Sequence, residues 1–180
     1  MSKVIDLNSY RTKLNLGQSN KININNTIMG KNKLYILIGI PCSGKSTYAN
    51  EYLNNSHTII VSSDKIRKDL TGTYKFSSEN NNLVFDIAKK QVQNALSNGF
   101  DAVVDATNTN RKYRKNFIKI SNEYNCNIIA IVFKTPLALC LKRNSKRDND
   151  RRVPEQIIIE MSEFDSKIKE SDGFDEIKYI

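Results

Sequence analysis

A nine-residue segment, GIPCSGKST from Gly39 to Thr47, contains the residue types that hold the phosphates of a nucleotide. It fits the GxxxxGK[ST] phosphate-binding loop and lies between an apolar run, Leu34 to Ile38, and a helix-compatible run that begins at Gly44. Such a turn points backbone N–H groups at the phosphates, and the helix N-terminus adds its positive dipole end. In this pattern Lys45 reaches the β- and γ-phosphates and the Ser46 hydroxyl binds Mg²⁺. The sequence therefore predicts a site for ATP and Mg²⁺ that includes Gly39, Pro41, Cys42, Ser43, Gly44, Lys45, Ser46 and Thr47.

A second cluster, SSDKIRKDL, contains a carboxylate and a guanidinium one helical turn apart. Asp64 could accept a proton from a hydroxyl nucleophile, and Arg67, three residues further on, could hold a substrate oxyanion. The alternative is structural, since Asp64 could simply cap the helix, with Ser62 and Ser63 as rival caps. The spacing alone does not decide between the two.

A third cluster, VVDATNTNRKYR, follows another apolar run and supplies Asp105, Thr107 and Asn108. An acid at the end of this strand could bind Mg²⁺ through water, order nearby arginines or face the substrate, and the sequence leaves these roles open. We assign all three residues to the substrate side of the predicted site.

The fourth cluster, LKRNSKRDNDRRVP, is strongly basic. Arg143 and Arg147 share a helix face at four-residue spacing, and Arg151 and Arg152 follow. Arginines on a mobile lid can neutralise the charge that spreads over a phosphoryl group during its transfer. A solvated basic turn is the structural alternative.

Apolar runs and helix-compatible segments alternate from residue 33 onward, which predicts a parallel sheet covered by helices on both faces. In such a sheet the ligand site lies at the carboxyl ends of the strands, where all four clusters fall. The first 30 residues are rich in Asn and lack periodicity, and we expect a weakly ordered extension there and a domain over 31–180. The predicted strands are Leu34–Ile38, Thr58–Ser62, Ala102–Asp105, Asn127–Lys134 and an edge strand Ile177–Ile180; the predicted helices are Lys45–Leu53, Lys65–Leu70, Asn81–Ser97, Arg111–Tyr124, Leu137–Arg147 and Pro154 to about Ile168.

Charge, hydropathy and cysteine content limit the kinds of partner that this chain could bind. The 180 residues carry a formal net charge of +9, and the segment 107–152 alone contains 12 Lys and Arg against 3 Asp and Glu. This block could be a platform for a polyanion or a set of solvated helix faces. No apolar stretch approaches the roughly 20 residues of a membrane span, so we expect no membrane association and a cytoplasmic location. Three widely spaced cysteines and one histidine support neither a disulfide framework nor a zinc site.

The four clusters together resemble the kinase domain of phage-type polynucleotide 5′-hydroxyl kinases, within the small P-loop kinases. The family pattern has four motifs: G-x-P-x-S-G-K-S-T, then S/R-D-x-x-R, then D-T-N or D-x-T-N, then R-N-x-K-R before V-P. This chain has GIPCSGKST, SDKIR, DATN and KRNSKRDNDRRVP in the same order. The segment FDIAK is also similar. The resemblance covers residues 33 to 165. It implies an α/β P-loop kinase fold with a mostly parallel sheet of four to five strands and a basic lid.

The resemblance also implies roles for individual residues. Lys45 and Ser46 would handle the phosphates and Mg²⁺, Asp64 would be the general base, and Arg67 would grip the phosphate next to the acceptor hydroxyl. Of the lid arginines, Arg147 would contact the transferring phosphate and Arg143 the nucleotide. Two positions depart from the pattern: Ala106 separates the acid from Thr107, and Cys42 stands where Gly is usual.

The expected activity is transfer of the γ-phosphate of ATP to the 5′-hydroxyl end of RNA or DNA, in nucleic-acid repair. No D-x-D-x-T phosphatase signature occurs in this chain, so we expect kinase activity without phosphatase activity. One alternative is a kinase of a small acceptor, such as a sugar, an antibiotic, an aminoacyl-tRNA or a nucleotide sugar, because the fold does not fix the substrate. Another is an ATP-switched module that only binds nucleic acid. The preference between RNA and DNA and the oligomeric state are open.

Overall fold

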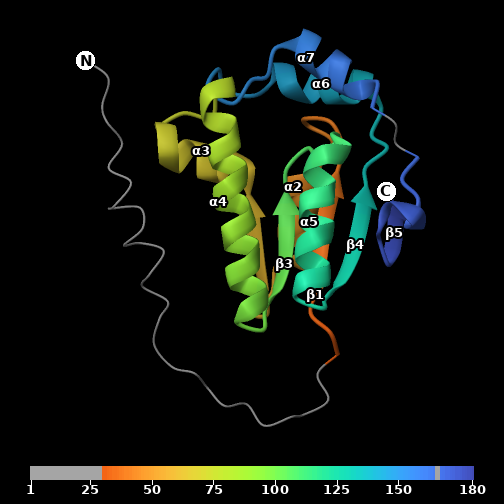
Figure 1. Ribbon diagram of the computed structural model, residues 1–180. Helices are drawn as coiled ribbons and strands as arrows, with labels where there is room; N and C mark the ends of the chain where they lie inside the picture. The colour runs from red at the N-terminus through yellow and green to blue at the C-terminus, as the bar shows by residue number, and fades with distance from the viewer. Residues whose placement is uncertain (1–29, 165–166) are drawn as a thin grey trace. The chain divides into compact units, whose positions relative to one another are not determined.

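Five parallel strands form the central sheet, in the order β2-β3-β1-β4-β5 (Figure 1). The chain is described by a computed structural model over residues 30–164 and 167–180, and residues 31–180 form one unit. The predicted N-terminal extension therefore lies outside the described residues, apart from Gly30. The strands are β1 Lys33–Ile38, β2 Thr58–Ser62, β3 Asp101–Asp105, β4 Asn127–Val132 and β5 Glu176–Tyr179.

Strand β1 is the middle strand and carries the phosphate-binding loop at its carboxyl end. It pairs with β3 and β4, so that Ile36 lies opposite Val104 on one side and Ala130 on the other. All three residues are buried. Near-continuous runs of buried aliphatic residues are typical of parallel strands that are covered on both faces.

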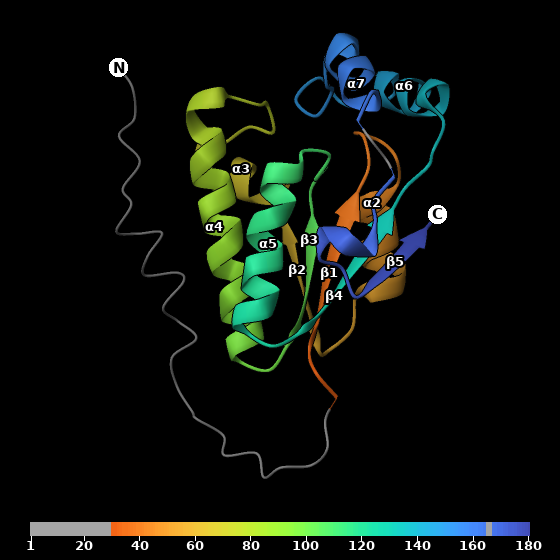
Figure 2. The same cartoon turned by 45° about the vertical axis from the view of Figure 1, so that its right-hand side comes forward.

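Helices cover both faces of this sheet. Figure 2 shows α4 and α5 on one face and α2 on the other, while α6 and α7 lie across the carboxyl edge of the strands. The predicted α/β fold, with a parallel sheet covered by helices on both faces, is therefore confirmed. The helices are α2 Lys45–Tyr48 with its π-helical continuation η1 Ala49–Leu53, α3 Ser63–Thr71, α4 Ser78–Ser97, α5 Arg111–Glu123, α6 Leu137–Ser145, α7 Glu155–Ser162 and the short 3₁₀-helix η2 Glu170–Asp172.

A separate apolar cluster fastens α6 and α7 to the phosphate-binding loop. Its buried members are Ile40 and Cys42 from the loop, Cys140 from α6 and Ile158 from α7. Full burial of an isoleucine side chain such as Ile40 or Ile158 is worth roughly 1.5–3 kcal/mol, so α6 and α7 have an apolar attachment to the loop.

Four predicted helices have a boundary that differs from the structure by two residues or more. Helix α4 begins at Ser78 rather than Asn81. Helix α3 begins at Ser63 rather than Lys65, because the Ser62 hydroxyl accepts a hydrogen bond from the Lys65 N–H and caps the helix. Helix α6 ends at Ser145, so Arg147 lies in the loop that follows it. Helix α7 ends at Ser162 rather than near Ile168, and Phe164 turns back onto the cluster of α6 and α7.

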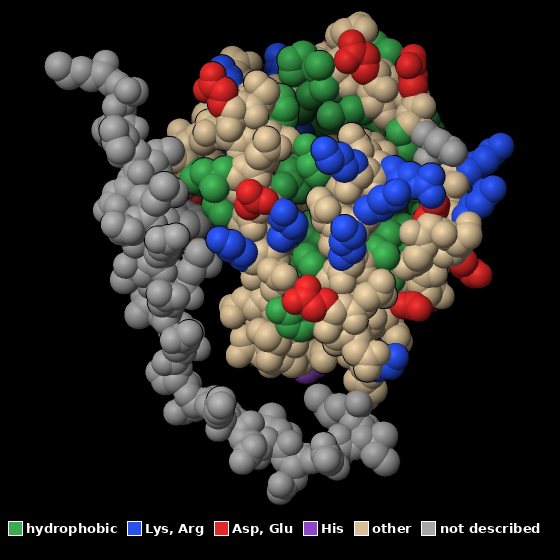
Figure 3. Space-filling view, viewed as in Figure 1, with side chains coloured by type: hydrophobic (Ala, Val, Ile, Leu, Met, Phe, Trp, Pro, Cys, Tyr) green, Lys and Arg blue, Asp and Glu red, His purple; other side chains and the backbone are tan. Residues whose placement is uncertain are grey.

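Positive charge gathers over and beside α5 on the face seen in Figure 3. Figure 3 shows Lys and Arg side chains over α5 and beside it, with few acidic side chains among them. The basic block of the sequence is therefore divided between this face and the lid.

Candidate active site

The phosphate-binding loop connects β1 to α2 through two glycines that no other residue could replace without strain. A Cβ at Gly39 would lie 2.8 Å from Ser43 Oγ and 3.0 Å from Phe133 Cβ, which is too close for a real side chain. Gly44, the N-cap of α2, has a φ of 100° in the left-handed region. Both glycines are thus required by the turn itself.

Cys42 occupies a position that also favours glycine. Its φ is 65°, which explains why glycine is usual there in the family pattern. The thiol is buried against the lid, with Cys42 Sγ 3.9 Å from Asn144 Oδ1. Burial raises the pKa of the Cys42 thiol above its ordinary value, although nearby lysine and arginine charges oppose the effect. The structure therefore favours an inert cysteine.

Lys45 is folded against the loop with all three of its donors engaged. Its Nζ donates to the carbonyl oxygens of Gly39 (2.9 Å) and Ile40 (2.7 Å) and to Ser43 Oγ (3.2 Å), and the residue is 7% exposed. Burial lowers the pKa of the Lys45 ammonium to about 8, while the carboxylates of Asp105 and Asp64 act in the opposite direction. A bound phosphate would add negative charge beside this ammonium.

Binding of ATP should therefore become weaker as the pH rises above about 8. Lys45 of the free protein loses its proton near pH 8, but the phosphates favour the charged form, so binding takes up a proton between the free and bound pKa values. We expect a loss of up to about tenfold in affinity per pH unit above pH 8. Titration calorimetry in two buffers of different ionisation enthalpy measures both the affinity and the proton uptake. The variant Lys45→Met should bind ATP weakly without this pH dependence, and a wild-type affinity that stays constant up to about pH 10 would contradict the lowered pKa.

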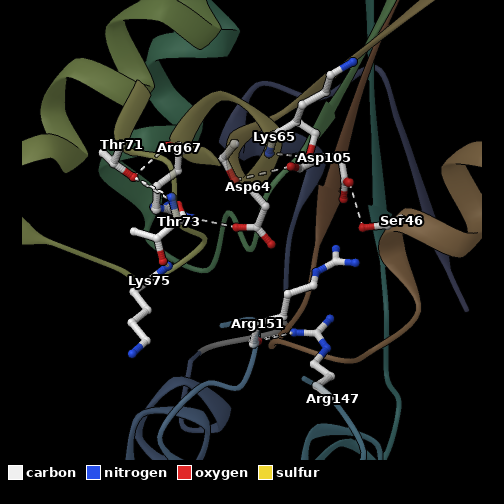
Figure 4. A network of polar contacts seen from close by, with 12 residues as sticks. Ser46, Asp64, Lys65, Arg67, Thr71, Thr73, Lys75, Asp105, Arg147 and Arg151 are labelled. Carbon is white, nitrogen blue, oxygen red and sulfur yellow. Dashed lines mark hydrogen bonds and ion pairs between the residues drawn. The ribbon is translucent and has the colours of Figure 1, made fainter. Parts of the chain in front are cut away.

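Asp105 lies next to Ser46, the residue predicted to bind Mg²⁺. Ser46 Oγ donates to Asp105 Oδ2 over 2.7 Å (Figure 4). Burial raises the pKa of the Asp105 carboxyl, while the Ser46 hydrogen bond and the Lys45 charge lower it. A hydroxyl and a carboxylate are hard oxygen ligands, and Mg²⁺ in such sites takes one or two protein oxygens together with phosphates and water. Ser46 and Asp105 thus fit the predicted Mg²⁺ site, and of the roles left open for Asp105 this geometry favours the one next to the metal.

Asp64 and Arg67 form an ion pair at the end of β2. Arg67 Nη1 lies 2.7 Å from Asp64 Oδ1, and the Asp64 side chain is half-exposed whereas that of Arg67 is buried. Because Ser62 supplies the helix cap, Asp64 is free of that structural role. Asp64 Oδ2 can therefore accept a hydrogen bond from an acceptor hydroxyl while Arg67 binds Asp64 Oδ1.

Asn108 is buried and hydrogen-bonded to the backbone at the edge of the sheet. It is 2% exposed, and its Nδ2 donates to the Leu37 carbonyl over 2.8 Å and to two carbonyls at the end of β3. Its φ of 48° is left-handed, a conformation that Asn tolerates. Thr107 also has a structural bond, since its carbonyl accepts the Gly39 N–H over 2.9 Å. This geometry favours a structural role for Asn108, and the substrate roles of Asn108 and of the partly exposed Thr107 side chain stay predictions.

Two lid arginines point from the loop after α6 toward the carboxylates and Ser46. Figure 4 shows the side chains of Arg147 and Arg151 extending in this direction, and Arg147 Nη1 donates to the Arg151 carbonyl over 3.4 Å. Arg143 lies over the phosphate-binding loop and donates to the Cys42 carbonyl over 3.2 Å. Arg152 instead donates to the carbonyls of Ser145 and Arg147 and fixes the loop. Arg152 therefore has a structural role in this loop, and phosphate contacts of the other three arginines stay a prediction.

A polar latch joins the lid loop to helix α3 and the turn that follows it. Asp150 accepts from Lys68 Nζ over 3.1 Å and from the Thr73 hydroxyl, and the Arg151 guanidinium lies 4.7 Å from the centre of the Tyr74 ring. Sequence reasoning missed this latch, because it joins residues about 80 positions apart whose types are ordinary on a surface. It places Arg151 near the ion pair on α3.

The remaining lid residue of note is Asn144, also missed from the sequence. It is fully buried, donates to the Val153 carbonyl over 2.7 Å and accepts the Val153 N–H over 3.0 Å. This two-way bridge closes the lid loop on itself. The only signal of this role in the sequence is that Asn144 is an uncharged residue within the basic segment RNSKR.

A family model of the AAA domain matches residues 34–164. The chain belongs to this AAA domain family. The matched range contains the phosphate-binding loop, both carboxylates and the whole lid loop, so every residue of the candidate site lies within the AAA domain. Together with the five-stranded parallel sheet, this identifies a P-loop kinase domain.

Known proteins are similar to this AAA domain in sequence and in fold. L-seryl-tRNA(Sec) kinase of Methanococcus maripaludis is 34% identical over 135 residues, which cover 72% of this chain and 51% of that protein. A chain in the structure of the Pnkp1/Rnl/Hen1 RNA repair complex superposes with a TM-score of 0.66 and 26% identity over 81% of this chain and 48% of that one. The APS kinase CysC of Mycobacterium tuberculosis, in complex with AMPPNP and APS, shares the fold at 19% identity and a TM-score of 0.53, over 66% of this chain and 71% of that one. The present chain thus spans about half the length of the first two relatives.

The cysteines and the helices bear on the expectations about disulfides, metal sites and membrane spans. All three cysteines are free and buried, and within residues 30–164 and 167–180 no group of three or more His, Cys, Asp and Glu side chains could hold a metal ion. In the same part of the chain, no helix has both the length and the apolar character needed to cross a bilayer. The cytoplasmic location stays a prediction.

Proposed function

We propose that this chain transfers the γ-phosphoryl group of ATP to the 5′-hydroxyl end of RNA or DNA. The observation that carries the proposal is the Asp64–Arg67 ion pair, which lies at the same sheet edge as the phosphate-binding loop and near the lid arginines. The carboxylate can take a proton from an alcohol that attacks the γ-phosphate, and the guanidinium can bind an anionic group next to that alcohol. A 5′-hydroxyl nucleotide with its own phosphodiester fits that description.

The proposed reaction is an in-line displacement. Asp64 takes the proton of the acceptor hydroxyl, the hydroxyl oxygen forms a bond to the γ-phosphorus, and the bond from that phosphorus to the β–γ bridging oxygen breaks to release ADP. Lys45 and Arg147 balance the charge on the phosphoryl oxygens, which is where such enzymes gain most of their rate. Mg²⁺, held through Ser46 and Asp105, would supply further positive charge at the β- and γ-phosphates. Arg67 orients the acceptor through its adjacent phosphate.

The same geometry also supports a second acceptor, the serine of an aminoacyl-tRNA. The 34% identity with L-seryl-tRNA(Sec) kinase favours this candidate as much as the RNA repair complex favours the first. Both acceptors present an alcohol attached to a polyanion, so the catalytic residues would serve either. A module that only binds ATP is less well supported, since it would have no use for a half-exposed carboxylate beside a buried arginine.

Transfer of label from γ-labelled ATP distinguishes these functions. The purified chain is incubated with Mg²⁺ and matched 5′-hydroxyl RNA and DNA, with their 5′-phosphorylated counterparts, and with tRNA that carries serine or no amino acid. The first proposal predicts label on the 5′-hydroxyl oligonucleotides alone. Label that requires the attached serine would replace it by the second candidate, and ATP binding without any labelled product would contradict both.

Removal of the Arg67 guanidinium should affect the acceptor more than ATP. We expect Arg67→Ala to raise the KM for a 5′-hydroxyl oligonucleotide by about 10-fold or more, because a charge-assisted bond to phosphate is worth roughly 1.5–3 kcal/mol. Steady-state kinetics with each substrate varied in turn give the two KM values. The exposed Lys65→Ala variant, from the same helix, is the matched control. Equal increases in KM for ATP and oligonucleotide would argue against this role of Arg67.

A further inference from the structure

Helix α5 has one face made of exposed cationic side chains. Arg111, Lys112, Lys115 and Lys119 are all exposed, and their spacing of one, four and eight residues places them on one side of the helix. The opposite side packs inward through Phe117 and other buried residues. Glu123, at the end, is the only acidic residue of α5.

These cations are not consumed by local ion pairs. In the described part of the chain, Lys112, Lys115 and Lys119 form no ion pair, whereas Arg111 Nη2 lies 2.7 Å from Asp172 Oδ1. Three unpaired like charges on adjacent turns repel one another and cost stability. A row of lysines of this kind is stabilised when a polyanion lies over it. A nucleic-acid strand that binds there would release the counterions condensed on its phosphates.

The basic face continues beyond the helix around a hollow. A cavity of about 460 Å³ lies between the start of α5 and the segment after α7, and Lys167 and Lys169 line it together with Arg111 and Arg114. Lys167 and Lys169 are exposed. Figure 3 shows the resulting concentration of Lys and Arg over α5 and beside it. Lys167 and Lys169 therefore extend the row of cationic side chains of α5 around this hollow.

The row of lysines also begins at the catalytic edge. Helix α5 follows the loop after β3, and Arg114 Nη1 donates to the Asn108 and Thr109 carbonyls of that loop, over 2.9 and 2.8 Å. The helix then runs away from the carboxyl ends of the strands (Figure 1). A nucleic-acid strand whose 5′ end reaches the site can thus continue along α5.

We propose that this face of α5, defined by Lys112, Lys115 and Lys119, is the docking surface for the phosphodiester backbone of the acceptor nucleic acid. The inference rests on the proposed function and extends it to nucleotides beyond the reacting end. Lysine contacts of this kind bind phosphates without reading sequence. The surface therefore sets affinity for long acceptors and leaves the chemical step unchanged.

The test uses the triple variant Lys112→Ser, Lys115→Ser, Lys119→Ser, with Lys31→Ser, Lys33→Ser, Lys178→Ser as a control of equal charge change. Binding of a long labelled single strand is measured by fluorescence anisotropy without ATP at several salt concentrations. We expect the α5 variant to lose at least about tenfold in affinity, and the slope of log affinity against log salt to fall by about 2, since each phosphate contact contributes about 0.7 on single strands. The control should retain both values, and ATP binding should be unchanged in both variants.

Kinetics separate this surface from the proposed reaction. With a long 5′-hydroxyl strand the α5 variant should show a raised KM and the same kcat, and with a dinucleotide it should match the wild type. Binding that depends on α5 in a protein that phosphorylates no 5′-hydroxyl would overturn the proposed function and leave the surface standing. Active protein in which the α5 variant and the control behave alike would overturn the surface. Wild-type protein that binds vesicles of anionic lipid through α5, and no nucleic acid, would also overturn it.

Discussion

The variant Asp64→Asn should lose at least about 100-fold in kcat while it still binds ATP. A carboxamide has the same shape as the carboxylate but cannot take a proton from the acceptor hydroxyl, and general-base catalysis contributes about 10²–10⁴-fold. The ion pair with Arg67 is also weakened, but the pair lies at the surface on the Asp64 side and Ser62 still caps α3. The fold should therefore be kept.

Single-turnover kinetics and thermal unfolding check this prediction together. Asp69→Asn is the matched control, because Asp69 is an exposed acid on the same helix and should leave kcat unchanged. If Asp64→Asn kept a wild-type kcat with a 5′-hydroxyl acceptor, Asp64 would not be the base. Loss of ATP binding in the variant would instead indicate a damaged site.

Removal of Arg147 should lower kcat by about 100-fold or more with little change in the KM for ATP. Arginines that reach a transferring phosphoryl group are worth about 10³–10⁵-fold in related chemistry, and the neighbouring Arg151 can replace part of the lost charge here. The Arg147→Ala variant should keep the lid loop in place, because Arg152 holds the backbone carbonyl of residue 147 and Asp150 remains bonded to Lys68. The effect should thus be confined to the transition state.

Affinity for ADP with aluminium fluoride and Mg²⁺ provides the readout for that claim, since this complex resembles the transferring phosphoryl group. Arg147→Ala should weaken its binding far more than the binding of ADP alone, and the exposed Lys146→Ala should change neither. A variant that loses both affinities equally would point to a nucleotide-binding role for Arg147. A wild-type kcat in Arg147→Ala, together with a large loss in Arg151→Ala, would transfer the role to Arg151.

The sequence predicted the elements whose signals are local. Apolar runs marked all five strands within two residues at each end, and the glycine and lysine spacing located the loop between β1 and α2. The pairing of Asp64 with Arg67 was also predictable, because three-residue spacing on a helix places side chains on one face. Each of these features is specified by residues that are close together in the sequence.

The features that the sequence did not specify are contacts between distant segments. The insertion of Ala106 obscured the role of Asp105, and only the positions of β1 and β3 bring its carboxylate to Ser46. Asn108 had the polar character of a substrate ligand, but its left-handed backbone turns the amide into the sheet edge. The latch between Asp150 and Lys68 depends on how the lid loop returns to α3, which no local pattern encodes.

The most direct test of the account is the position of the label after reaction of γ-labelled ATP with a 5′-hydroxyl oligonucleotide, compared with Asp64→Asn and with a 5′-phosphorylated control. Digestion of the product to mononucleotides should release the label only as a 5′-monophosphate of the first nucleotide. The account predicts that this label is absent with the blocked oligonucleotide and nearly absent with Asp64→Asn. Wild-type protein that binds ATP yet labels no 5′-hydroxyl end, of RNA or of DNA, would contradict it.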